Sequence, residues 1–388
     1  MDSPISYIAK VALRAPRLAR SIVEGHVRKH VLAPLEYHLG NDGYASTIKE
    51  IDLKITNMCN LRCRMCAQWG QSGYNYDRPP EVLREVVPAK YYKRVIDDCA
   101  RSNPLYYIWG GEPMMYPDIM EVLGHIKSRR NPVALINNGT LIEKHAAELV
   151  RMNVDTIMVS LDGPRELHDE IRCVRGTFDK LSAGCRAVLA ERNARKQITP
   201  ILILLITINT ANVSAIAETV KIAERLGADF IAIYWSWFTN REIGQRHTAF
   251  MEKHFCVTPT AWKGFVLDTV EIDVERLIEE VRRVRALKLK CPILFVPHLV
   301  ESQIRRYYSD PAHTFGYRRC YTPWWQVGIG PNGDVSTCRD YPDLVCGNIR
   351  EEPLPVIFNN ERFRHFRRML KANKLTPICG RCCGLMGF

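Results

Sequence analysis

The sequence predicts an α/β fold in which six strand–helix units form a partial (β/α)6 barrel. Between Lys49 and Tyr234, six short apolar runs alternate with amphipathic helical patterns, which is typical of a parallel sheet with right-handed crossovers. Each run also ends in polar or glycine-rich sequence, so the functional loops should gather at one edge of the sheet. The expected strands are Ile51–Ile55, Leu105–Trp109, Val133–Asn137, Thr156–Ser160, Ile201–Thr207 and Phe230–Tyr234.

Helical patterns separate these runs, with apolar residues three and four positions apart. Beyond Tyr234 the pattern is less regular, and we expect a bridging region at 241–318 after a barrel at 47–240. The expected helices cover Ala89–Ala100, Pro117–Arg129, Glu143–Met152, Lys180–Arg192 and Ser214–Leu226, with one more at Val274–Lys288 in the bridging region.

The C-terminal segment predicts a small β-hairpin and helix domain at 319–388. Apolar runs at Trp325–Gly330 and Val335–Cys338 flank the sequence Pro331-Asn332-Gly333-Asp334. An Asn-Gly pair between two such runs is a strong hairpin signal, because both residues tolerate positive φ angles. The fold class is therefore α/β, a partial barrel followed by a smaller hairpin domain.

A basic, helix-prone extension precedes the barrel at 1–46. Pro16 should divide two helices, because proline fits the first turn of a helix but not its interior. Two placements remain open for residues 4–34: packing on the outside of the barrel, or lying flat on an anionic membrane as a peripheral contact. The basic residues of this segment are Lys10, Arg14, Arg17, Arg20, Arg28 and Lys29.

The composition is that of a globular protein. Of 388 residues, 46% are hydrophobic and 25% are charged, which excludes collagen-like and wholly disordered chains. No apolar run reaches the roughly eighteen residues of a membrane-spanning helix. The 54 basic and 42 acidic residues give a net charge of +12, which favours an acidic partner such as an electron-transfer protein, nucleic acid or anionic lipid.

The fourteen cysteines are clustered along the chain, which favours metal binding over scattered disulfide bonds. The N-terminus shows no secretory signal, because Lys10 interrupts its apolar stretch and no small-residue cleavage site follows. We therefore expect a reducing, cytoplasmic location. If the N-terminal extension binds lipid, the location would be peripheral at the inner face of the membrane.

Three cysteines, Cys59, Cys63 and Cys66, stand on the loop that follows the first expected strand. A cubane iron–sulfur cluster has four irons, so three thiolates leave one iron open for a non-protein ligand. The alternative is a structural zinc site, which needs a closed shell of four ligands, and no fourth ligand lies at a familiar spacing nearby. The loop therefore favours an iron–sulfur cluster with an open coordination position.

This cysteine spacing, after the first strand of a partial barrel, resembles that of the radical S-adenosylmethionine (radical SAM) superfamily. Met65 departs from the family pattern, since members usually have an aromatic residue just before the third cysteine. The resemblance implies that Cys59, Cys63 and Cys66 bind a [4Fe-4S] cluster. It also implies that the amino and carboxylate groups of S-adenosyl-L-methionine (SAM) chelate the open iron.

Loops after the later strands resemble the SAM-contacting segments of the same superfamily. Gly110, Gly111 and Glu112 are similar to the glycine-glycine-glutamate motif that meets the SAM ammonium group. The other expected SAM contacts, for which turn formation is the alternative explanation, are Asn137, Ser160, Asp162 and Asn209.

Several nearby residues are not assigned to the site. His168 and Arg172 resemble a recurring family segment, but an exposed start of a helix would explain them as well. Tyr234, Trp235 and Trp237 end the sixth strand, and we expect them to pack under the bridging region.

Four cysteines in the C-terminal domain form a second candidate metal site. Cys320 and Cys338 flank the expected hairpin, and Cys379 and Cys382 form a C-x-x-C pair. Four thiolates would complete the ligand shell of a second cubane, although four cysteines bind zinc equally well. The spacing resembles the Twitch domain, a shortened form of the SPASM domain, and this implies one auxiliary [4Fe-4S] cluster.

By the resemblance, the protein cleaves SAM reductively to a 5′-deoxyadenosyl radical, which removes hydrogen from a substrate C–H bond. An auxiliary cluster with a closed shell favours electron transfer, giving oxidation (dehydrogenation) or bond formation on a sugar- or cyclitol-like metabolite or a peptide. Cys346 and Cys383 depart from the ligand pattern. Each could be an alternate ligand or a hydrogen-atom donor, and we interpret both as spare thiols.

The electron should come from a flavodoxin or ferredoxin. Two other function classes stay open: a nucleic-acid-binding or RNA-modifying protein with structural clusters, and a radical SAM enzyme acting on a membrane lipid. No nucleic acid partner is expected, because no RNA-binding module is apparent. The residues that either steer an acidic donor or form a solvated helix face are Arg364, Arg367, Arg368 and Lys371.

Overall fold

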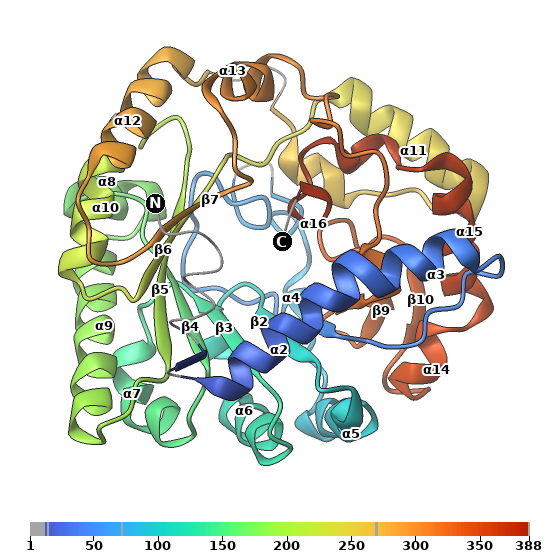
Figure 1. Ribbon diagram of the computed structural model, residues 1–388, viewed down its shortest axis with the longest axis horizontal. Helices are drawn as coiled ribbons and strands as arrows, with labels where there is room; N and C mark the ends of the chain where they lie inside the picture. Colours follow the sequence, from blue (N-terminus) through green and yellow to red (C-terminus); the bar gives the residue numbers. More distant parts are fainter. Residues whose placement is uncertain (1–11, 14, 71–72, 268–270, 387–388) are drawn as a thin grey trace.

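The computed structural model describes residues 12–13, 15–70, 73–267 and 271–386, and its strands form one ten-stranded sheet (Figure 1). The strand order is β10-β9-β8-β1-β2-β3-β4-β5-β6-β7. Neighbours from β8 through β1 to β7 are parallel, whereas β8, β9 and β10 are antiparallel. The strands are β1 Glu50–Lys54, β2 Leu105–Trp109, β3 Val133–Asn137, β4 Thr156–Ser160, β5 Ile201–Thr207, β6 Phe230–Tyr234, β7 Ile293–Val296, β8 Gln326–Ile329, β9 Asp334–Ser336 and β10 Val345–Asn348.

The six predicted strands are confirmed, and five of them have the predicted bounds. The structure adds β7, which pairs with β6 in parallel through Ile231 and Ile293. The sequence did not predict β7, because its four residues, flanked by Pro292 and Pro297, are too few to give a clear strand pattern. The barrel sheet therefore has seven parallel strands from β1 to β7.

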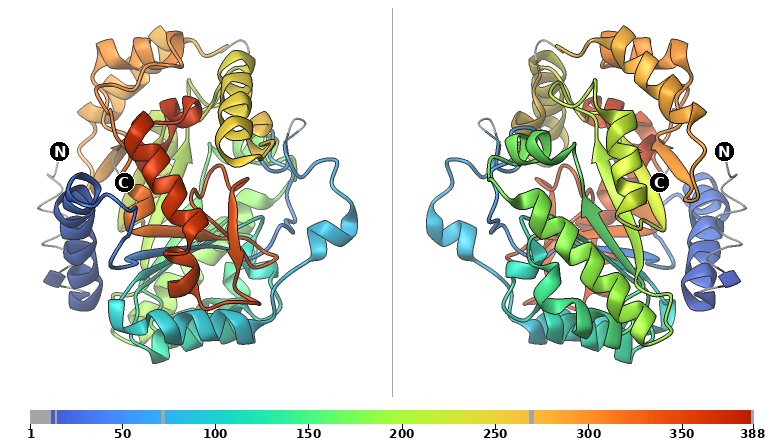
Figure 2. Two further views of the ribbon diagram at one scale, coloured as in Figure 1. Left: turned by 90° about the vertical axis from the view of Figure 1, so that its right-hand side faces the viewer. Right: turned by 90° about the vertical axis from the view of Figure 1, so that its left-hand side faces the viewer.

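Helices cover the outer face of the barrel sheet (Figures 1 and 2). Apolar residues of the strands such as Ile51, Leu135 and Leu204 are fully buried against these helices. The helices after β1 are α4 Pro80–Arg84, α5 Ala89–Cys99, α6 Ile119–Ser128, α7 Ile142–Arg151, α8 Arg165–Arg172, α9 Thr177–Ala194, α10 Ile216–Arg225, α11 Arg241–Phe255, α12 Val274–Ala286, α13 Glu301–Ser309, α14 Leu354–Phe358, α15 Glu361–Asn373 and α16 Cys383–Met386.

The inner face of the barrel sheet is polar at β1 and apolar at β3 to β6. Successive side chains of a strand point to opposite faces, so the buried outer residues Ile51 and Leu53 place Asp52 and Lys54 on the inner face. At β5 the inner residues are Ile201, Ile203 and Leu205, which pack in a separate apolar cluster. The charged side of the inner face is therefore next to the C-terminal hairpin, which pairs with β1.

The N-terminal segment packs against the inner face of the sheet, so the expectation of outside packing is wrong. A helix runs from α2, Pro16–Val27, through a five-residue π-helical turn into α3, Ala33–Leu39. Leu18 and Ala19 of α2 are buried in the inner apolar cluster. This apolar patch of the sheet would otherwise face water, and burying it favours the observed position.

Pro16 is the first residue of α2, and residues 12–13 before it are helical. The proline therefore stands at the predicted boundary between two helical segments, where it costs no hydrogen bond. Lys10 and Arg14 lie outside the described residues. No helix within the described ranges is both long enough and apolar enough to span a membrane.

The C-terminal hairpin is confirmed, and it extends the barrel sheet. Gly333 adopts a φ of 89° in the turn between β8 and β9, which the Asn-Gly signal requires. Residues of β8 pair in parallel with β1, from Glu50 opposite Gln326 to Leu53 opposite Ile329. The hairpin domain and the barrel are thus joined by backbone hydrogen bonds of one sheet.

Candidate active site

The three cysteines of the loop after β1 meet at one cavity of about 260 Å³, here called the cysteine-loop cavity. The loop is shaped by its own backbone, since the Cys66 N–H donates to the Cys63 carbonyl at 3.1 Å and the Gly70 N–H to the Cys66 carbonyl at 2.7 Å. The other predicted residues that line this cavity are Gly110, Gly111, Asn137 and Ser160. These predicted residues thus come together at the carboxyl ends of β1 to β4.

The cysteine-loop cavity suits thiolate ligands of a positively charged cluster. Burial raises the pKa of the Cys59 thiol to about 12, so a free thiolate there is unfavourable without a nearby positive charge. The Leu61 N–H donates to the Cys59 Sγ at 3.4 Å, and Arg172 Nη1 lies 3.6 Å from the Cys63 Sγ. Donors that face sulfur in this way stabilise its anionic form, as cluster ligation requires.

Arg172 is held in place by Asp162, which lies behind the cavity wall. The two side chains form an ion pair, and both are buried. The Asp162 carboxylate also accepts from the Thr207 N–H at 3.3 Å, while its own N–H donates to His168 Nδ1 at 3.2 Å. Asp162 does not line the cavity and is the ion-pair partner of Arg172, and its expected SAM contact stays a prediction.

The Gly110-Gly111 pair lets two loops approach each other closely. The Gly111 N–H donates to the Thr56 carbonyl at 2.8 Å. A Cβ at Gly110 would lie 2.5 Å from that carbonyl oxygen, and one at Gly111 would lie 2.2 Å from the Met58 oxygen. The backbone that comes close here is the chain's own cysteine loop, so the glycines shape the wall of the cavity.

Glu112 lies just outside the cavity, with its carboxylate occupied by backbone donors. It is 1% exposed and accepts from the Met114 N–H at 3.0 Å and the Asn138 N–H at 2.8 Å. Burial raises its pKa to about 7, against the lowering effect of these donors. Glu112 therefore joins the loop after β2 to the loop after β3, and its side chain is not among those that line the cavity.

Asn137 and Asn209 both use their side chains to shape turns. The Asn137 Oδ1 accepts from the Gly139 N–H at 2.8 Å, although Asn137 also lines the cavity. The Asn209 Oδ1 accepts from the Ala211 N–H at 3.0 Å, and Asn209 does not line the cavity. For Asn209 the geometry is that of turn formation, the alternative that the sequence left open.

The sequence analysis missed several cavity residues, of which Gln68 and Trp109 carry a specific signal. The Gln68 Oε1 and Trp109 Nε1 atoms are buried without a hydrogen-bond partner in the described chain, a state that usually marks an absent ligand or water. SAM carries donors and acceptors that could satisfy both atoms. The further lining residues that the sequence analysis did not assign to the site are Leu61, Met65, Trp69, Ile136, Asn138, Arg172 and Thr207.

The four cysteines of the C-terminal domain line a second cavity of about 60 Å³, here called the auxiliary cavity. Burial raises the pKa of Cys379 to about 12, and Thr376 Oγ1 lies 3.2 Å from its sulfur. Within the described residues, no group of three or more Cys, His, Asp or Glu side chains lies close enough together to hold a single metal ion. The predicted ligands that meet at this cavity are Cys320, Cys338, Cys379 and Cys382.

Cys346 is separate from the auxiliary cavity. Its side chain is 5% exposed within the main hydrophobic core, and it does not line either cysteine cavity. This position agrees with its interpretation as a spare thiol. The side chain of Cys383 lies outside the described residues.

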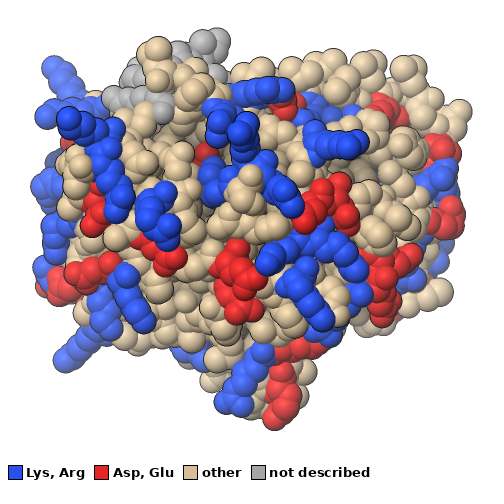
Figure 3. Space-filling view, turned by 90° about the horizontal axis from the view of Figure 1, so that it is seen from below, with Lys and Arg blue, Asp and Glu red and all other residues tan. Residues whose placement is uncertain are grey.

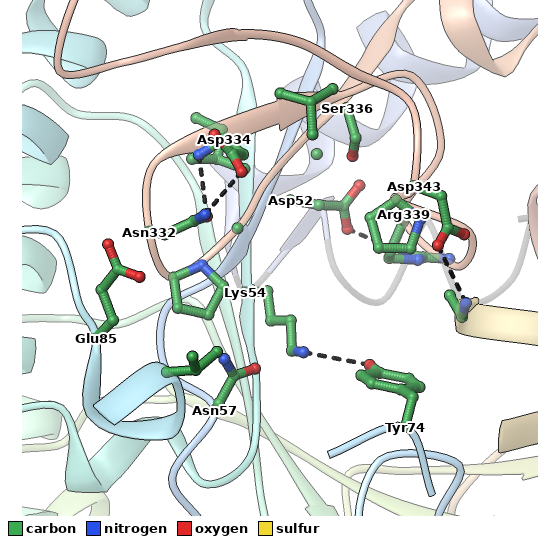
Figure 4. Close-up of a pocket in the computed structure, with 18 of the residues that line it drawn as sticks. Asp52, Lys54, Asn57, Tyr74, Glu85, Asn332, Asp334, Ser336, Arg339 and Asp343 are labelled. Carbon is green, nitrogen blue, oxygen red and sulfur yellow. Dashed lines mark hydrogen bonds and ion pairs between the residues drawn. The ribbon is translucent and has the colours of Figure 1, made fainter. Parts of the chain in front are cut away.

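A third cavity, of about 190 Å³, lies between β1, the β8–β9 hairpin and the loop 73–85 (Figure 4), and we call it the central cavity. It shares Trp109 with the cysteine-loop cavity and Arg339 with the auxiliary cavity. The Arg339 guanidinium lies 3.1 Å from the Asp52 carboxylate of β1. The central cavity therefore adjoins both cysteine cavities through shared wall residues.

Of the four basic residues of α15, Arg367 is buried and cannot belong to a docking surface, while the other three are partly exposed and contact residues 40–42. Arg367 is fully buried and donates to the Pro323 and Gly43 carbonyls at 2.7 and 3.0 Å. Lys371 donates to the Gly40 carbonyl at 2.7 Å, and Arg364 and Arg368 both bind Asp42. On the face near α5 and α6, basic and acidic side chains are interspersed (Figure 3).

The aromatic residues after β6 pack in the interior, as predicted. Trp235 is 3% exposed and stacks on Phe295 with ring centroids 5.6 Å apart. Trp237 contacts Phe265 at 5.0 Å. Neither residue lines the cysteine-loop cavity.

Comparison with known proteins identifies both cysteine regions. Residues 53–223 match the radical SAM superfamily, and residues 320–383 match the SPASM iron–sulfur cluster-binding domain. The AdoMet-dependent heme synthase of Nitratidesulfovibrio vulgaris is 25% identical over 87% of this chain and 85% of its own. The serine-type anaerobic sulfatase-maturating enzyme of Bacteroides thetaiotaomicron is 23% identical over 84% of this chain and 77% of its own.

Solved structures share the fold. Streptococcus suis SuiB bound to S-adenosylmethionine has a TM-score of 0.60 at 17% identity, over 85% of this chain and 70% of that one. SuiB bound to its precursor peptide SuiA has a TM-score of 0.59 at 18% identity, over 87% and 69%. The cysteine loop lies within the matched radical SAM region, and the four C-terminal cysteines lie within the matched SPASM region. The chain is therefore a radical SAM superfamily protein with a C-terminal iron–sulfur cluster-binding domain of the SPASM type.

Proposed function

We propose that this protein is a radical SAM enzyme that oxidises a C–H position of a substrate held in the central cavity, or forms a bond there. The observation that carries the proposal is the meeting of Cys59, Cys63 and Cys66 at a cavity that adjoins the central cavity. When bound, the [4Fe-4S] cluster and SAM supply a 5′-deoxyadenosyl radical that removes hydrogen from carbon.

The chain's own residues position and shield this chemistry. Arg172 holds positive charge against the Cys63 sulfur, and Asp162 fixes the direction of Arg172. Gln68 donates to the Gly110 carbonyl at 2.9 Å, which joins the cysteine loop to the loop after β2. With Gly111, Asn137 and Ser160 these residues form the proposed SAM-binding wall, where fixed geometry keeps the reacting atoms aligned.

The auxiliary cavity is proposed to hold one [4Fe-4S] cluster on Cys320, Cys338, Cys379 and Cys382. Four protein thiolates leave no iron open, which favours electron transfer over substrate binding. Arg339 follows Cys338 in the chain and reaches the central cavity, where it pairs with Asp52. A substrate radical in the central cavity would therefore lie beside an electron acceptor, which supports oxidation as the outcome.

The relatives act in several kinds of pathway by name: heme synthesis, sulfatase maturation and biosynthesis of the bacteriocin subtilosin. The likeness to each covers about four-fifths of this chain or more. We therefore propose the substrate as a metabolite or peptide and take its further chemistry from the central cavity. An acidic flavodoxin or ferredoxin is the proposed electron donor, since the net charge of +12 favours an acidic partner.

Anaerobic reconstitution with iron and sulfide tests the proposal. Wild type should hold about eight irons, two cubanes, and release 5′-deoxyadenosine when dithionite is added with SAM. A triple variant with alanine at Cys59, Cys63 and Cys66 should hold about four irons and release none. The double variant Cys379→Ala/Cys382→Ala should lose the other half of the iron, which assigns the two sites separately.

A protein with purely structural clusters would give a different result. It would hold the same iron but release no 5′-deoxyadenosine, and that outcome would refute the proposed function. Deuterium transfer from labelled candidate substrates into 5′-deoxyadenosine, followed by mass spectrometry, would then identify the attacked carbon in an active preparation.

A further inference from the structure

Four acidic side chains line the central cavity, and each has a hydrogen-bond or ion-pair partner within the chain (Figure 4). Asp52 pairs with Arg339 at 3.1 Å, and Glu85 pairs with Arg350 at 3.3 Å. The Asp334 carboxylate accepts from two asparagine side chains, and the Asp343 carboxylate accepts from two backbone N–H groups. Each of these four acids therefore already has a partner within the chain, although the Asp343 Oδ2 atom is buried without one.

Two cations of the same cavity lack an acidic partner. Lys54 is 9% exposed, and its Nζ donates to the Tyr74 hydroxyl at 3.2 Å and lies 4.8 Å from the ring centroid. The Arg78 guanidinium lies 5.8 Å from the same ring. In the described parts of the chain, no carboxylate lies within 4.0 Å of either cationic group.

A buried ammonium without a counterion is costly, so its persistence in a cavity points to a missing anion. Burial, and after it the positive charge of Arg78, lower the pKa of Lys54 to about 7, against the raising effect of Cys66. A bound anion beside Lys54 would keep its ammonium group charged at neutral pH. A phenol hydroxyl satisfies one of the three donors of Lys54 and supplies no charge. Lys54 is also the last residue of β1, so it lies at the edge of the sheet where the cysteine loop begins.

We propose that the central cavity binds an anionic group of the substrate, a carboxylate or a phosphate, between Lys54 and Arg78. This inference rests on the proposed function, because it describes the substrate of the same site. It narrows the substrate class to acids, such as acidic side chains of a peptide, carboxylated metabolites or sugar phosphates. Binding of this anionic group would hold the substrate beside the cysteine-loop cavity, which shares Trp109 with the central cavity.

Calorimetric titration of the reconstituted, SAM-loaded protein tests the inference without turnover. The probes are succinate and inorganic phosphate, with succinamide as the uncharged match for succinate, all at one ionic strength. Wild type should bind at least one anion and not succinamide, and the preferred anion distinguishes a carboxylate from a phosphate. Lys54→Met should weaken anion binding about tenfold or more, since a charged hydrogen bond is lost.

The matched control is Lys90→Met, which removes an exposed lysine of α5 and should leave anion binding unchanged. If Lys54→Met fails to fold, Arg78→Gln at an exposed position carries the test and should also weaken binding. Absence of anion binding in wild type, or equal affinity in wild type and both cavity variants, would overturn the inference. Because no radical chemistry is measured, failure of the proposed function would appear separately, as an absence of 5′-deoxyadenosine.

A second inference comes independently from the outer face of the N-terminal helix. Large apolar side chains recur every fourth residue along it, which is one face of a helix. Their exposed fractions run from 43% at Val27 to 77% at Leu39. The exposed members of this row are Val23, Val27, Val31, Leu35 and Leu39, with Leu32 beside them, and we call it the apolar row.

The charges around the apolar row are basic or neutral. Arg17 and Arg20 are exposed at the start of α2. The helix has two acids, Glu24 and Glu36, and both are turned partly inward: Glu24 binds Lys49, and Glu36 binds the buried Arg28. The exposed Asp42 just beyond the row pairs with Arg364. An exposed apolar row bordered by cations, whose neighbouring acids are paired within the chain, matches an anionic lipid surface.

We infer that the apolar row docks the protein on an anionic membrane surface. The start of the helix is fixed in the barrel by the buried residues Leu18 and Ala19, so the row is presented on a rigid support. In Figure 2 this helix lies at one side of the molecule, and α4 lies at the other. Membrane docking would thus leave the side near α4 facing the aqueous phase.

Vesicle flotation of the full-length protein tests membrane docking. The protein should float with vesicles of phosphatidylcholine and phosphatidylglycerol, and less with phosphatidylcholine alone. Val27→Glu/Val31→Glu should reduce the floating fraction several-fold, because two charges would enter the apolar region. The control Val356→Glu places a charge at a similarly exposed valine of α14, 52% exposed, and should float like wild type.

A second copy of the chain is the competing occupant of the row, and light scattering after gel filtration decides between them. A monomer that floats, with the double variant impaired, supports membrane docking. Membrane docking would be overturned if wild type is a dimer and the double variant is a monomer. It would also be overturned if Val356→Glu reduces the floating fraction as much as the double variant does.

Discussion

Arg172 joins three parts of the site at the residue scale: the cysteine loop, β4 and α8. Its guanidinium faces the Cys63 sulfur at 3.6 Å and forms a buried ion pair with Asp162. Removing one partner of such a pair strands the other charge in the interior, which usually costs more than the pair contributed. Arg172 is thus both an electrostatic and a packing requirement of the site.

We predict that Arg172→Gln lowers the free energy of unfolding by about 3 kcal/mol, because Asp162 loses its counterion. It should also reduce iron incorporation at the cysteine loop. The control is Arg64→Gln on the same loop, whose ion pair with Glu170 is exposed and should contribute less than about 1 kcal/mol. Urea unfolding and iron analysis measure both effects. If both variants lose the same free energy of unfolding, the buried Arg172–Asp162 pair contributes no more to stability than the exposed Arg64–Glu170 pair.

His168 gives the site region a dependence on pH. Burial, and after it the positive charge of Arg172, lower the pKa of His168 to about 4 in the folded protein. The unfolded chain has a histidine pKa of about 6.5. Since the folded pKa is the lower one, the stabilisation is complete above pH 6.5 and is lost as the pH falls through 6.5 toward 4.

We therefore predict that lowering the pH from 7.5 to 5.0 costs wild type about 2 kcal/mol through His168 alone. His168→Gln should lose less stability over the same range, although it starts from a lower value. Exposed His26→Gln is the control and should follow wild type. Urea unfolding at both pH values provides the measurement, and parallel losses in wild type and His168→Gln would contradict the assignment.

At this scale the sequence predicted residues with a chemical spacing and missed residues that act through space. Cys59, Cys63 and Cys66 could be assigned because three thiols spaced closely on one loop indicate a cluster site. Arg172 could not, because the sequence does not show that the last turn of α8 faces Cys63, which lies 109 residues earlier in the chain. The Asp52 and Lys54 pair did carry a signal, since charged residues alternate with apolar ones in β1, and that period-two pattern places them on one face.

At the scale of elements, α15 acts as a support for the chain that connects α3 to β1. Arg367 donates to the Gly43 and Pro323 carbonyls and is flanked by the rings of Phe358 and Phe363, 4.2 and 4.4 Å from its guanidinium carbon. Composition could not reveal this role, because a basic cluster on an amphipathic helix reads the same whether its charges face water or backbone carbonyls. The Arg367 guanidinium is buried and forms hydrogen bonds with backbone carbonyls instead of with water.

We predict that Arg367→Met lowers the free energy of unfolding by about 2–4 kcal/mol, because two buried carbonyls lose their donor. Arg368→Met on the same helix is the matched control. Its side chain is 34% exposed and pairs with Glu361 at the surface, so the loss should stay below about 1 kcal/mol. Differential scanning calorimetry compares the two, and a larger loss in Arg368→Met would contradict the supporting role of Arg367.

At the scale of the whole molecule, the barrel and the hairpin domain share one sheet. The sequence predicted both parts but placed them as separate domains, because the pairing of β8 with β1 joins residues more than 270 positions apart and leaves no local pattern. The N-terminal helix reinforces the junction, since Tyr37 packs on Trp324 with ring centroids 5.1 Å apart. The first and last parts of the chain therefore stabilise each other across β1.

This continuity predicts that the barrel does not fold without the C-terminal domain. Truncation after residue 318 removes β8 and α15, so it exposes the edge of β1 with its unpaired backbone groups and strips the contacts of α3. The truncated chain should aggregate or unfold without a cooperative transition. The control is the full-length chain without iron, which lacks the clusters but keeps β8, and it should still unfold cooperatively. Circular dichroism during urea unfolding measures both, and a cooperative transition in the truncated chain would mean that the barrel is an independent folding unit despite the shared sheet.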